Sequence, residues 1–146
     1  MSVVTGGRRS SGLDELRGKR LPGVYLINVP KAVKSYYKIG ISEEDIERRL
    51  TEYLGYYPWS FYVVAVILYP DNYMKYITVR EAESELHKFL QEVKVMPFPG
   101  QKRTEWFRLK TQKQIKQTLA KMKEIADRTG GKMSYFGESH VIKLPG

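Results

Sequence analysis

The chain has 146 residues and no cysteine, with 42% hydrophobic residues, 12% aromatic residues and a net charge of +9. This length predicts one domain with a single core. The lack of cysteine excludes disulfides, thiolate zinc sites and a cysteine nucleophile. No stretch approaches a transmembrane span, and the first residues lack the apolar core of a signal peptide. We therefore expect an intracellular protein that is neither secreted nor inserted in a membrane.

The positive charge is concentrated at the two ends of the chain. Residues 1–20 carry five Lys or Arg against two Asp or Glu, residues 21–100 nine against ten, and residues 101–146 eleven against four. A near-neutral body with basic flanks fits a protein whose ends hold an acidic polymer. Basic flanks are also common as solubilising tails, so charge alone leaves open whether nucleic acid is the partner.

The first half of the chain predicts an arm, a hairpin and a helix. Residues 1–20 are rich in Gly, Ser and Arg without an apolar period, which predicts a basic flexible arm. Val24–Val29 and Tyr36–Ile41 predict two strands, and their short connection favours an antiparallel hairpin. Ser42, followed by acidic residues, predicts the capped start of a helix that ends near Leu54.

The second half predicts one long strand, one short strand and two helices. Trp59–Tyr69 is the longest apolar run and predicts a central strand buried on both faces. Thr78–Lys94 predicts an amphipathic helix, and Trp106–Leu109 predicts either a short strand or an extended closing segment. Thr111–Arg128 predicts a last helix that begins with a capping box.

Together these elements predict an α+β fold with a small central antiparallel three-stranded sheet flanked by helices. We expect the folded domain at residues 21–110, between the arm at 1–20 and a basic C-terminal helix and tail at 111–146. Lys132–Gly146 has no clear period, which leaves open whether this tail is docked or free.

Helical geometry distinguishes Glu83 from its acidic neighbours in the Thr78–Lys94 helix. The predicted inner face consists of Val79, Ala82, Leu86, Phe89, Leu90 and Val93. At about 100° per residue, Glu83 lies roughly 60° from the centre of that face, whereas Glu85 and Glu81 lie roughly 100° and 140° away. His87 follows Glu83 by one turn on the same edge. A carboxylate at the rim of the core needs a partner, and both a metal ion and a basic side chain fit that need.

The same geometry separates the two arginines of the preceding helix. Its predicted inner face consists of Ile46, Leu50, Tyr53 and Leu54. Arg49 lies roughly 100° from the centre of that face and Arg48 roughly 160° away, so Arg49 can reach a site beside the sheet. A guanidinium there could hold a phosphate through two parallel hydrogen bonds. The alternative is a surface ion pair with Glu52 or Asp45, and periodicity leaves both open.

Four short motifs, in this order, resemble the GIY-YIG nuclease superfamily over roughly residues 22–109. They are Gly23-Val24-Tyr25, Tyr37-Lys38-Ile39-Gly40, Asp45-Ile46-Glu47-Arg48-Arg49-Leu50 and the helix around Glu83. The chain is most similar to the small phage, viral and bacterial branch, where Lys-Ile-Gly stands for the second motif. A Glu-Trp-Phe phrase, here Glu105-Trp106-Phe107, tends to close the domain in that branch.

The resemblance implies a metal-dependent DNA endonuclease that hydrolyses phosphodiester bonds. Tyr25 would activate or position the attacking water. Arg49 would bind the scissile phosphate, with Arg48 as a minor alternative from the residue spacing of the motif. Tyr53 matches a site position that holds Tyr or His in relatives. Glu83 matches the single metal-binding glutamate, for one Mg²⁺ or Mn²⁺ ion whose other ligands are waters and phosphate oxygens. The implied partner is double-stranded or branched DNA, whereas the target and the oligomeric state stay open.

Two positions depart from the pattern of this superfamily. Lys38 stands where many relatives carry the second tyrosine, and Tyr37 would face the other way on a strand. Because a free tyrosine has a pKa of about 10, an ammonium beside Tyr25 would favour its phenolate, which makes Lys38 a candidate catalytic residue. No asparagine stands where many relatives carry one after the glutamate helix, so that role is either absent or filled by something near Glu105. A nucleic-acid-binding module that kept the fold without catalysis is therefore the alternative function.

Basic and aromatic residues outside the motifs are candidates for holding nucleic acid. The candidates in the arm are Arg8, Arg9, Arg17, Lys19 and Arg20. The candidates in the last helix are Lys113, Lys116, Lys121 and Lys123. Tyr56, Tyr57 and Trp59 are candidates for stacking on unpaired bases, although core packing is the commoner use of such side chains.

Overall fold

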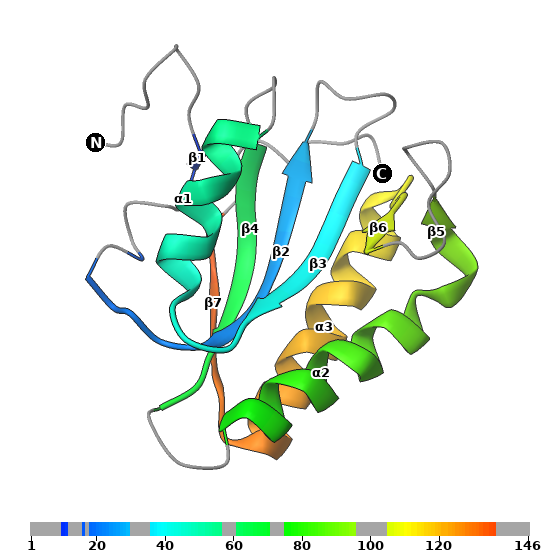
Figure 1. Cartoon of the computed structure of the whole chain (residues 1–146). Coiled ribbons are helices and arrows are strands. Elements are labelled where there is room, and N and C mark those ends of the chain that lie inside the picture. Colours follow the sequence, from blue (N-terminus) through cyan, green and yellow to red (C-terminus); the bar gives the residue numbers. More distant parts are fainter. Residues whose placement is uncertain are drawn as a thin grey trace.

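A computed structural model describes residues 10–11, 16, 18–29, 36–56, 61–70, 75–95 and 105–136 of the chain. Its strands are β1 (Ser10–Ser11), β2 (Gly23–Val29), β3 (Tyr36–Ser42), β4 (Phe61–Leu68), β5 (Lys94–Val95), β6 (Trp106–Phe107) and β7 (Lys132–Tyr135). Its helices are α1 (Ile46–Tyr56), α2 (Lys75–Phe89), a 3-10 helix at Gln91–Val93, and α3 (Gln112–Thr129). The predicted α+β class is confirmed (Figure 1).

The strands of the described residues form one sheet in the order β1-β4-β2-β3-β6-β5, and β7 also pairs with β4. The centre of the sheet is antiparallel, and Tyr25 on β2 lies opposite Gly40 on β3 and Val66 on β4. This centre, formed by β4, β2 and β3, is the predicted three-stranded sheet. The shorter strands extend it on both sides, because β6 adds to β3 while β1 and β7 add to β4.

The helices cover both faces of the sheet, and the alternation of β2 decides what faces each of them. Val24 and Leu26 belong to the apolar cluster beneath α2 and α3. Tyr25 and Ile27 belong to the cluster beneath α1. Figure 1 shows α2 and α3 side by side, apart from α1. All of β2 is therefore buried, as expected for a strand with helices on both sides.

The start of α1 differs from the prediction, which placed the N-cap at Ser42. The Ser42 hydroxyl instead accepts a hydrogen bond from the Asp45 backbone N–H at 2.9 Å, within the turn that precedes the helix. Asp45 is the cap, since its Oδ1 accepts from the Arg48 backbone N–H at 3.1 Å. The helix then continues past Leu54 to Tyr56.

The end of α2 also differs from the prediction of one helix running to Lys94. The α-helix ends at Phe89, and Gln91–Val93 form a tighter 3-10 turn that leads into β5. The prediction that Phe89 faces the core is wrong, because 48% of this residue is exposed. Leu90, at the end of the helix, is buried in its place.

The last helix agrees with the sequence prediction at both ends. Thr111 is the N-cap, and the full capping box with Gln114 is present. Gly130 ends the helix with a φ of 83°, a left-handed conformation that glycine adopts without strain. The buried side of α3, including Ile115 and Met122, packs into the same cluster as β2, so this helix is part of the folded body.

Both ends of the described chain pack against the sheet. Leu16 is fully buried beneath α1, and Ser10 pairs with Phe61, so part of the predicted flexible arm is held in place. Strand β7 pairs with the last four residues of β4, so Lys132–Tyr135 is docked on the sheet. Within the described ranges, no helix is long and apolar enough to cross a membrane.

Candidate active site

The hydroxyl of Tyr25 lies over Gly40 of the adjacent strand. The two residues are paired across β2 and β3, and Tyr25 is only 1% exposed. A Cβ atom at position 40 would overlap the hydroxyl and the ring carbon that bears it. Gly40 is therefore required by this close approach, which links the first two sequence motifs physically.

Tyr25 belongs to a chain of polar contacts with Tyr53 and Lys38. The hydroxyls of Tyr25 and Tyr53 form a short hydrogen bond in which either atom can be the donor. The Lys38 ammonium donates to the Tyr53 hydroxyl at 3.1 Å and lies 4.4 Å from the centre of the Tyr53 ring. Strand β3 directs Lys38 to the α1 side of the sheet, whereas Tyr37 lies in the opposite cluster, as predicted.

The side chain of Arg49 lies beside Tyr53 at the surface. Its guanidinium carbon is 5.9 Å from the centre of the Tyr53 ring, and Nη1 is 4.0 Å from Glu52 Oε1. The pKa of Arg49 is raised above its ordinary value, chiefly by Tyr53, with a smaller contribution from Tyr25. Arg49 therefore lies beside Tyr53 and also near Glu52, one of its two predicted surface partners. Arg48 instead pairs with Glu44 at 3.4 Å and is exposed, as predicted.

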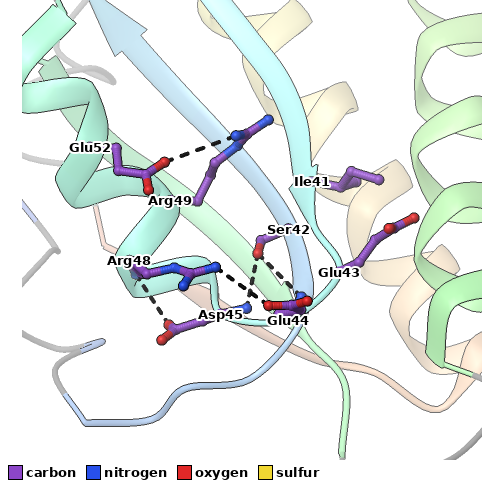
Figure 2. A pocket seen from close by; sticks show the side chains of 8 residues that line it. All are labelled: Ile41, Ser42, Glu43, Glu44, Asp45, Arg48, Arg49 and Glu52. Atoms are coloured by element: carbon purple, nitrogen blue, oxygen red, sulfur yellow. Dashed lines mark hydrogen bonds and ion pairs between the residues drawn. The ribbon is translucent and has the colours of Figure 1, made fainter.

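A pocket of about 400 Å³ opens between the end of β3 and the start of α1 (Figure 2). It is lined by Ile41, Ser42, Glu43, Glu44, Asp45, Arg48, Arg49 and Glu52. Arg49 extends across it from α1, while Glu43 on the other side forms an ion pair with Arg80 of α2. The arginine side of this pocket adjoins the Tyr25–Tyr53 pair and is the part suited to an anion.

Glu83 lies at the rim of the core on α2, as the helical phase predicted. Its side chain is 21% exposed. The pKa of Glu83 is raised to about 7, first by burial and then by the carboxylates of Glu105 and Glu43, while the ammonium of Lys38 acts in the opposite direction. By contrast, Glu85 is paired with Arg128 at 2.5 Å, and this hydrogen bond lowers its pKa. Glu83 is thus the carboxylate of α2 that shares its electrostatic environment with Lys38.

His87 lies one turn after Glu83 on the same edge of α2, as the helical phase predicted. Its Nε2 is 3.7 Å from Glu83 Oε2 and 3.1 Å from the Ile39 carbonyl oxygen. Because burial lowers the pKa of His87, the neutral ring with the proton on Nε2 donates to that carbonyl. The ring also packs against Phe107, with centres 5.0 Å apart.

The residues around Glu83 offer few metal ligands, so they suit only a cation that needs few ligands from the protein. Among the described residues, no group of three or more His, Cys, Asp or Glu could hold a metal ion. Mg²⁺ and Mn²⁺ accept one carboxylate with several waters, and a divalent charge would offset the unfavourable ionisation of the partly buried Glu83. The residues present therefore fit such an ion through Glu83.

The contact between Glu105 and Lys38 was not predicted from the sequence. Glu105 Oε1 lies 3.4 Å from the Lys38 ammonium, and the Trp106 ring centre lies 5.8 Å from it. The sequence placed Glu105-Trp106-Phe107 at the end of the domain and allowed a residue near Glu105 to fill the role of the missing asparagine, but it did not predict a contact with Lys38. The available signal was the opposite charge of Glu105 and Lys38.

The predicted nucleic-acid contacts are divided between different parts of the molecule. Lys19 and Arg20 are exposed just before β2, whereas Arg8, Arg9 and Arg17 lie outside the described residues, as do the side chains of Tyr56, Tyr57 and Trp59. Lys121 and Lys123 form ion pairs with acidic residues, while Lys113 and Lys116 line a shallow hollow on α3. Because α3 covers the sheet face opposite α1, nucleic acid would have to pass around the sheet edge to contact both α3 and Tyr25.

Comparison with known families gives one match. The family model described as the T5orf172 domain matches residues 23–123, from the start of β2 into α3. The matched span contains Tyr25, Lys38, Arg49, Tyr53 and Glu83. This domain is phage-associated and occurs in nuclease-related proteins, which indicates a nucleic-acid partner. No curated protein and no solved structure matches the chain.

Proposed function

The chain belongs to the T5orf172 domain family, and from this premise we propose that it is a metal-dependent DNA endonuclease of the GIY-YIG type. The observation that carries the proposal is the contact of Tyr25 and Lys38 with the same hydroxyl, that of Tyr53. Arg49 lies beside that same tyrosine, and Glu83 lies in the electrostatic field of Lys38. These relationships support a common site for water activation, phosphate binding and cation binding.

The role of Tyr25 follows from the order of the hydrogen bonds. Lys38 can only donate, so the Tyr53 oxygen accepts from it and is left with its own proton to donate. Donation from Tyr53 to Tyr25 stabilises negative charge on the Tyr25 oxygen, which makes that oxygen a better acceptor for a proton of water. Water attacks phosphorus as the P–O bond on the opposite side breaks, and Tyr25 orients the attacking water.

Arg49 would bind the scissile phosphate through its exposed guanidinium. Its weak pairing with Glu52, at 4.0 Å, leaves its planar donors available to two phosphate oxygens. Glu83 would hold the Mg²⁺ or Mn²⁺ ion, which when bound supplies positive charge to the phosphate and to the leaving oxygen. The neutral His87 ring lies 3.7 Å from the Glu83 carboxylate.

Nicking of supercoiled plasmid DNA tests the proposal. We expect the wild-type protein to nick in Mg²⁺ and not in excess EDTA. Tyr25→Phe and Glu83→Gln are each expected to lower the rate by on the order of 10²- to 10⁴-fold, because each removes a group that acts on the reacting atoms. Glu81→Gln, an exposed glutamate on the same helix, is the matched control and should nick at the wild-type rate.

A wild-type protein that binds DNA tightly but does not nick would overturn the endonuclease proposal. That result would favour a nucleic-acid-binding module that retains the fold, the reading consistent with the absent asparagine. Nicking that persists in Glu83→Gln at the wild-type rate would instead point to a contaminating nuclease.

A further inference from the structure

We propose that Glu105 is a positioning residue that holds the Lys38 ammonium against Tyr53, so that Lys-Ile-Gly and Glu-Trp-Phe act as one unit. The inference rests on the proposed function and assigns a role that the site motifs themselves do not supply. Glu105 Oε1 lies 3.4 Å from Lys38 Nζ, which lies 3.1 Å from the Tyr53 hydroxyl. The carboxylate therefore stands at the outer end of a chain that leads to Tyr25.

The sheet brings these residues together by backbone pairing. Strand β6 pairs antiparallel with β3, with Lys38 opposite Trp106 and Tyr37 opposite Phe107. The Ile39 backbone N–H donates to the Glu105 carbonyl at 3.1 Å, which fixes the main chain at Glu105 directly beside the strand that carries Lys38. The main chain of Glu105, the residue directly before β6, is thus held against β3.

The environment of Lys38 explains why its long side chain needs such a partner. Lysine has a flexible four-carbon stem, so its ammonium must be held to donate in one direction. The Tyr53 ring centre lies 4.4 Å and the Trp106 ring centre 5.8 Å from Nζ, so the charge is flanked by two aromatic rings. Only 12% of the Lys38 side chain is exposed, whereas 48% of the Glu105 side chain is, so Glu105 pairs with the buried ammonium from the solvent side.

Phe107, the third residue of Glu-Trp-Phe, lies on the side of the site that holds Glu83. Phe107 packs on the His87 ring, which contacts both Glu83 and the Ile39 carbonyl. Residues 105–107 therefore contact Lys38 through Glu105 and Trp106, and contact His87, the neighbour of Glu83, through Phe107.

A double-mutant cycle tests the proposal, with nicking rate and DNA affinity as separate measurements. Glu105→Gln is expected to lower kcat by on the order of ten- to a hundred-fold, because a misplaced catalytic group costs rate rather than binding. DNA affinity measured in EDTA should stay within about two-fold of wild type. The double variant Lys38→Met/Glu105→Gln should be no slower than Lys38→Met alone, since Glu105 acts only through Lys38.

Conservative variants and controls separate positioning from other roles. Glu105→Asp keeps the charge and should recover part of the lost rate, whereas Glu81→Gln should match the wild type. Thermal unfolding of each variant, compared with its kcat, distinguishes lost positioning from lost fold. If Glu105→Gln unfolds near the assay temperature, the recovery in Glu105→Asp decides the question.

Three outcomes would overturn the inference while leaving the nuclease proposal intact. The first is a wild-type rate in Glu105→Gln, and the second is a rate loss that multiplies with that of Lys38→Met. The third is a Glu105→Gln defect that excess Mg²⁺ abolishes, because it would make Glu105 a metal ligand. A wild-type protein that does not nick at all would overturn the proposed function itself, and this inference with it.

Discussion

The Tyr25 hydroxyl occupies the space above Gly40 in which the side chain of any other residue would begin. We therefore expect Gly40→Ala to displace the Tyr25 ring and to separate its hydroxyl from Tyr53. Overpacking of this kind costs about 1–3 kcal/mol of unfolding free energy. Chemical denaturation would measure that loss, with Ser84→Ala on the exposed side of α2 as the control.

The activity of Gly40→Ala should fall more than its stability implies. The displaced Tyr25 no longer holds water in line with the phosphate, so nicking should drop by on the order of 10²-fold even where the protein is folded. A folded Gly40→Ala variant with normal nicking would contradict the assigned position of Tyr25.

The two neighbouring arginines of α1 offer a matched pair of substitutions. Arg49→Lys removes the planar fork that binds two phosphate oxygens, and nicking is expected to fall by on the order of ten- to a hundred-fold. Arg48→Lys keeps the charge at a residue that pairs with Glu44 away from Tyr53, so its rate should stay at the wild-type level. Equal losses in both variants would mean that total charge on α1, rather than Arg49, matters.

The Tyr53 hydroxyl links Lys38 to Tyr25, so its removal should break the chain between them. Tyr53→Phe keeps the ring that packs on Phe61 and is expected to cost about 1 kcal/mol of stability. The nicking rate should fall further, and Lys38→Met should add little to it because both act through the same hydrogen bond. Tyr36→Phe, in the same sheet, serves as the control, and additive losses would show that Lys38 acts independently of Tyr53.

The raised pKa of Glu83 predicts that the metal-free protein loses stability as pH rises. Burial moves this pKa from 4.5 in the unfolded chain to about 7 in the folded protein. Between these values the folded state binds more protons than the unfolded state, so unfolding free energy falls with increasing pH. The stabilisation is complete below pH 4.5 and lost above pH 7, with a magnitude of at most about 3 kcal/mol.

Thermal unfolding at pH 5 and pH 8, in EDTA, measures this effect. The wild type should lose stability relative to Glu83→Gln between the two pH values, and Mg²⁺ should restore part of it at pH 8. The difference between the two proteins is the relevant quantity, because His87, with its lowered pKa, contributes with the opposite sign. Parallel pH profiles for the two proteins would show that Glu83 ionises normally.

The lysines of α3 differ in their ion pairing, which predicts different effects on DNA binding. Lys121 and Lys123 are neutralised by Glu124 and Asp127 at 2.9 and 2.7 Å. Lys113 and Lys116 line the hollow on α3, where no ion pair of theirs occurs among the described residues. The double variant Lys113→Gln/Lys116→Gln should reduce the slope of log K against log[salt] by the equivalent of up to about two phosphate contacts. The double variant Lys121→Gln/Lys123→Gln should reduce this slope by less. Equal salt slopes would exclude α3 from the interface.

The parts of the fold that were predicted correctly depend on local signals. The β2–β3 hairpin follows from two β-branched runs, and α3 follows from its capping box and Gly130. The start of α1 was misplaced because Ser42 and Asp45 are equally good caps, and only tertiary contacts decide between them. Phe89 was misassigned because helical phase assumes that α2 continues, whereas it ends at that residue.

The candidate site was predicted in part for a similar reason. Helical phase separates Glu83 from Glu85 and Arg49 from Arg48 without knowledge of the sheet, and the structure agrees with both distinctions. The hydrogen bond between Tyr25 and Tyr53, and the ion pair of Lys38 with Glu105, join residues far apart in sequence. Such contacts depend on strand order and register, which composition and periodicity do not specify.

Strand β4 is paired along both of its edges. One of these edges is shared between β1, near the start of the described chain, and β7, near its end. β1 takes its first two residues and β7 its last four, while β2 lies along the other edge. The family match ends at residue 123, before β7. Without β7, the uncharged segment Ala65–Leu68 would present unpaired backbone groups that can pair with a second molecule. The C-terminal strand therefore protects the protein against self-association, a task separate from that of the site.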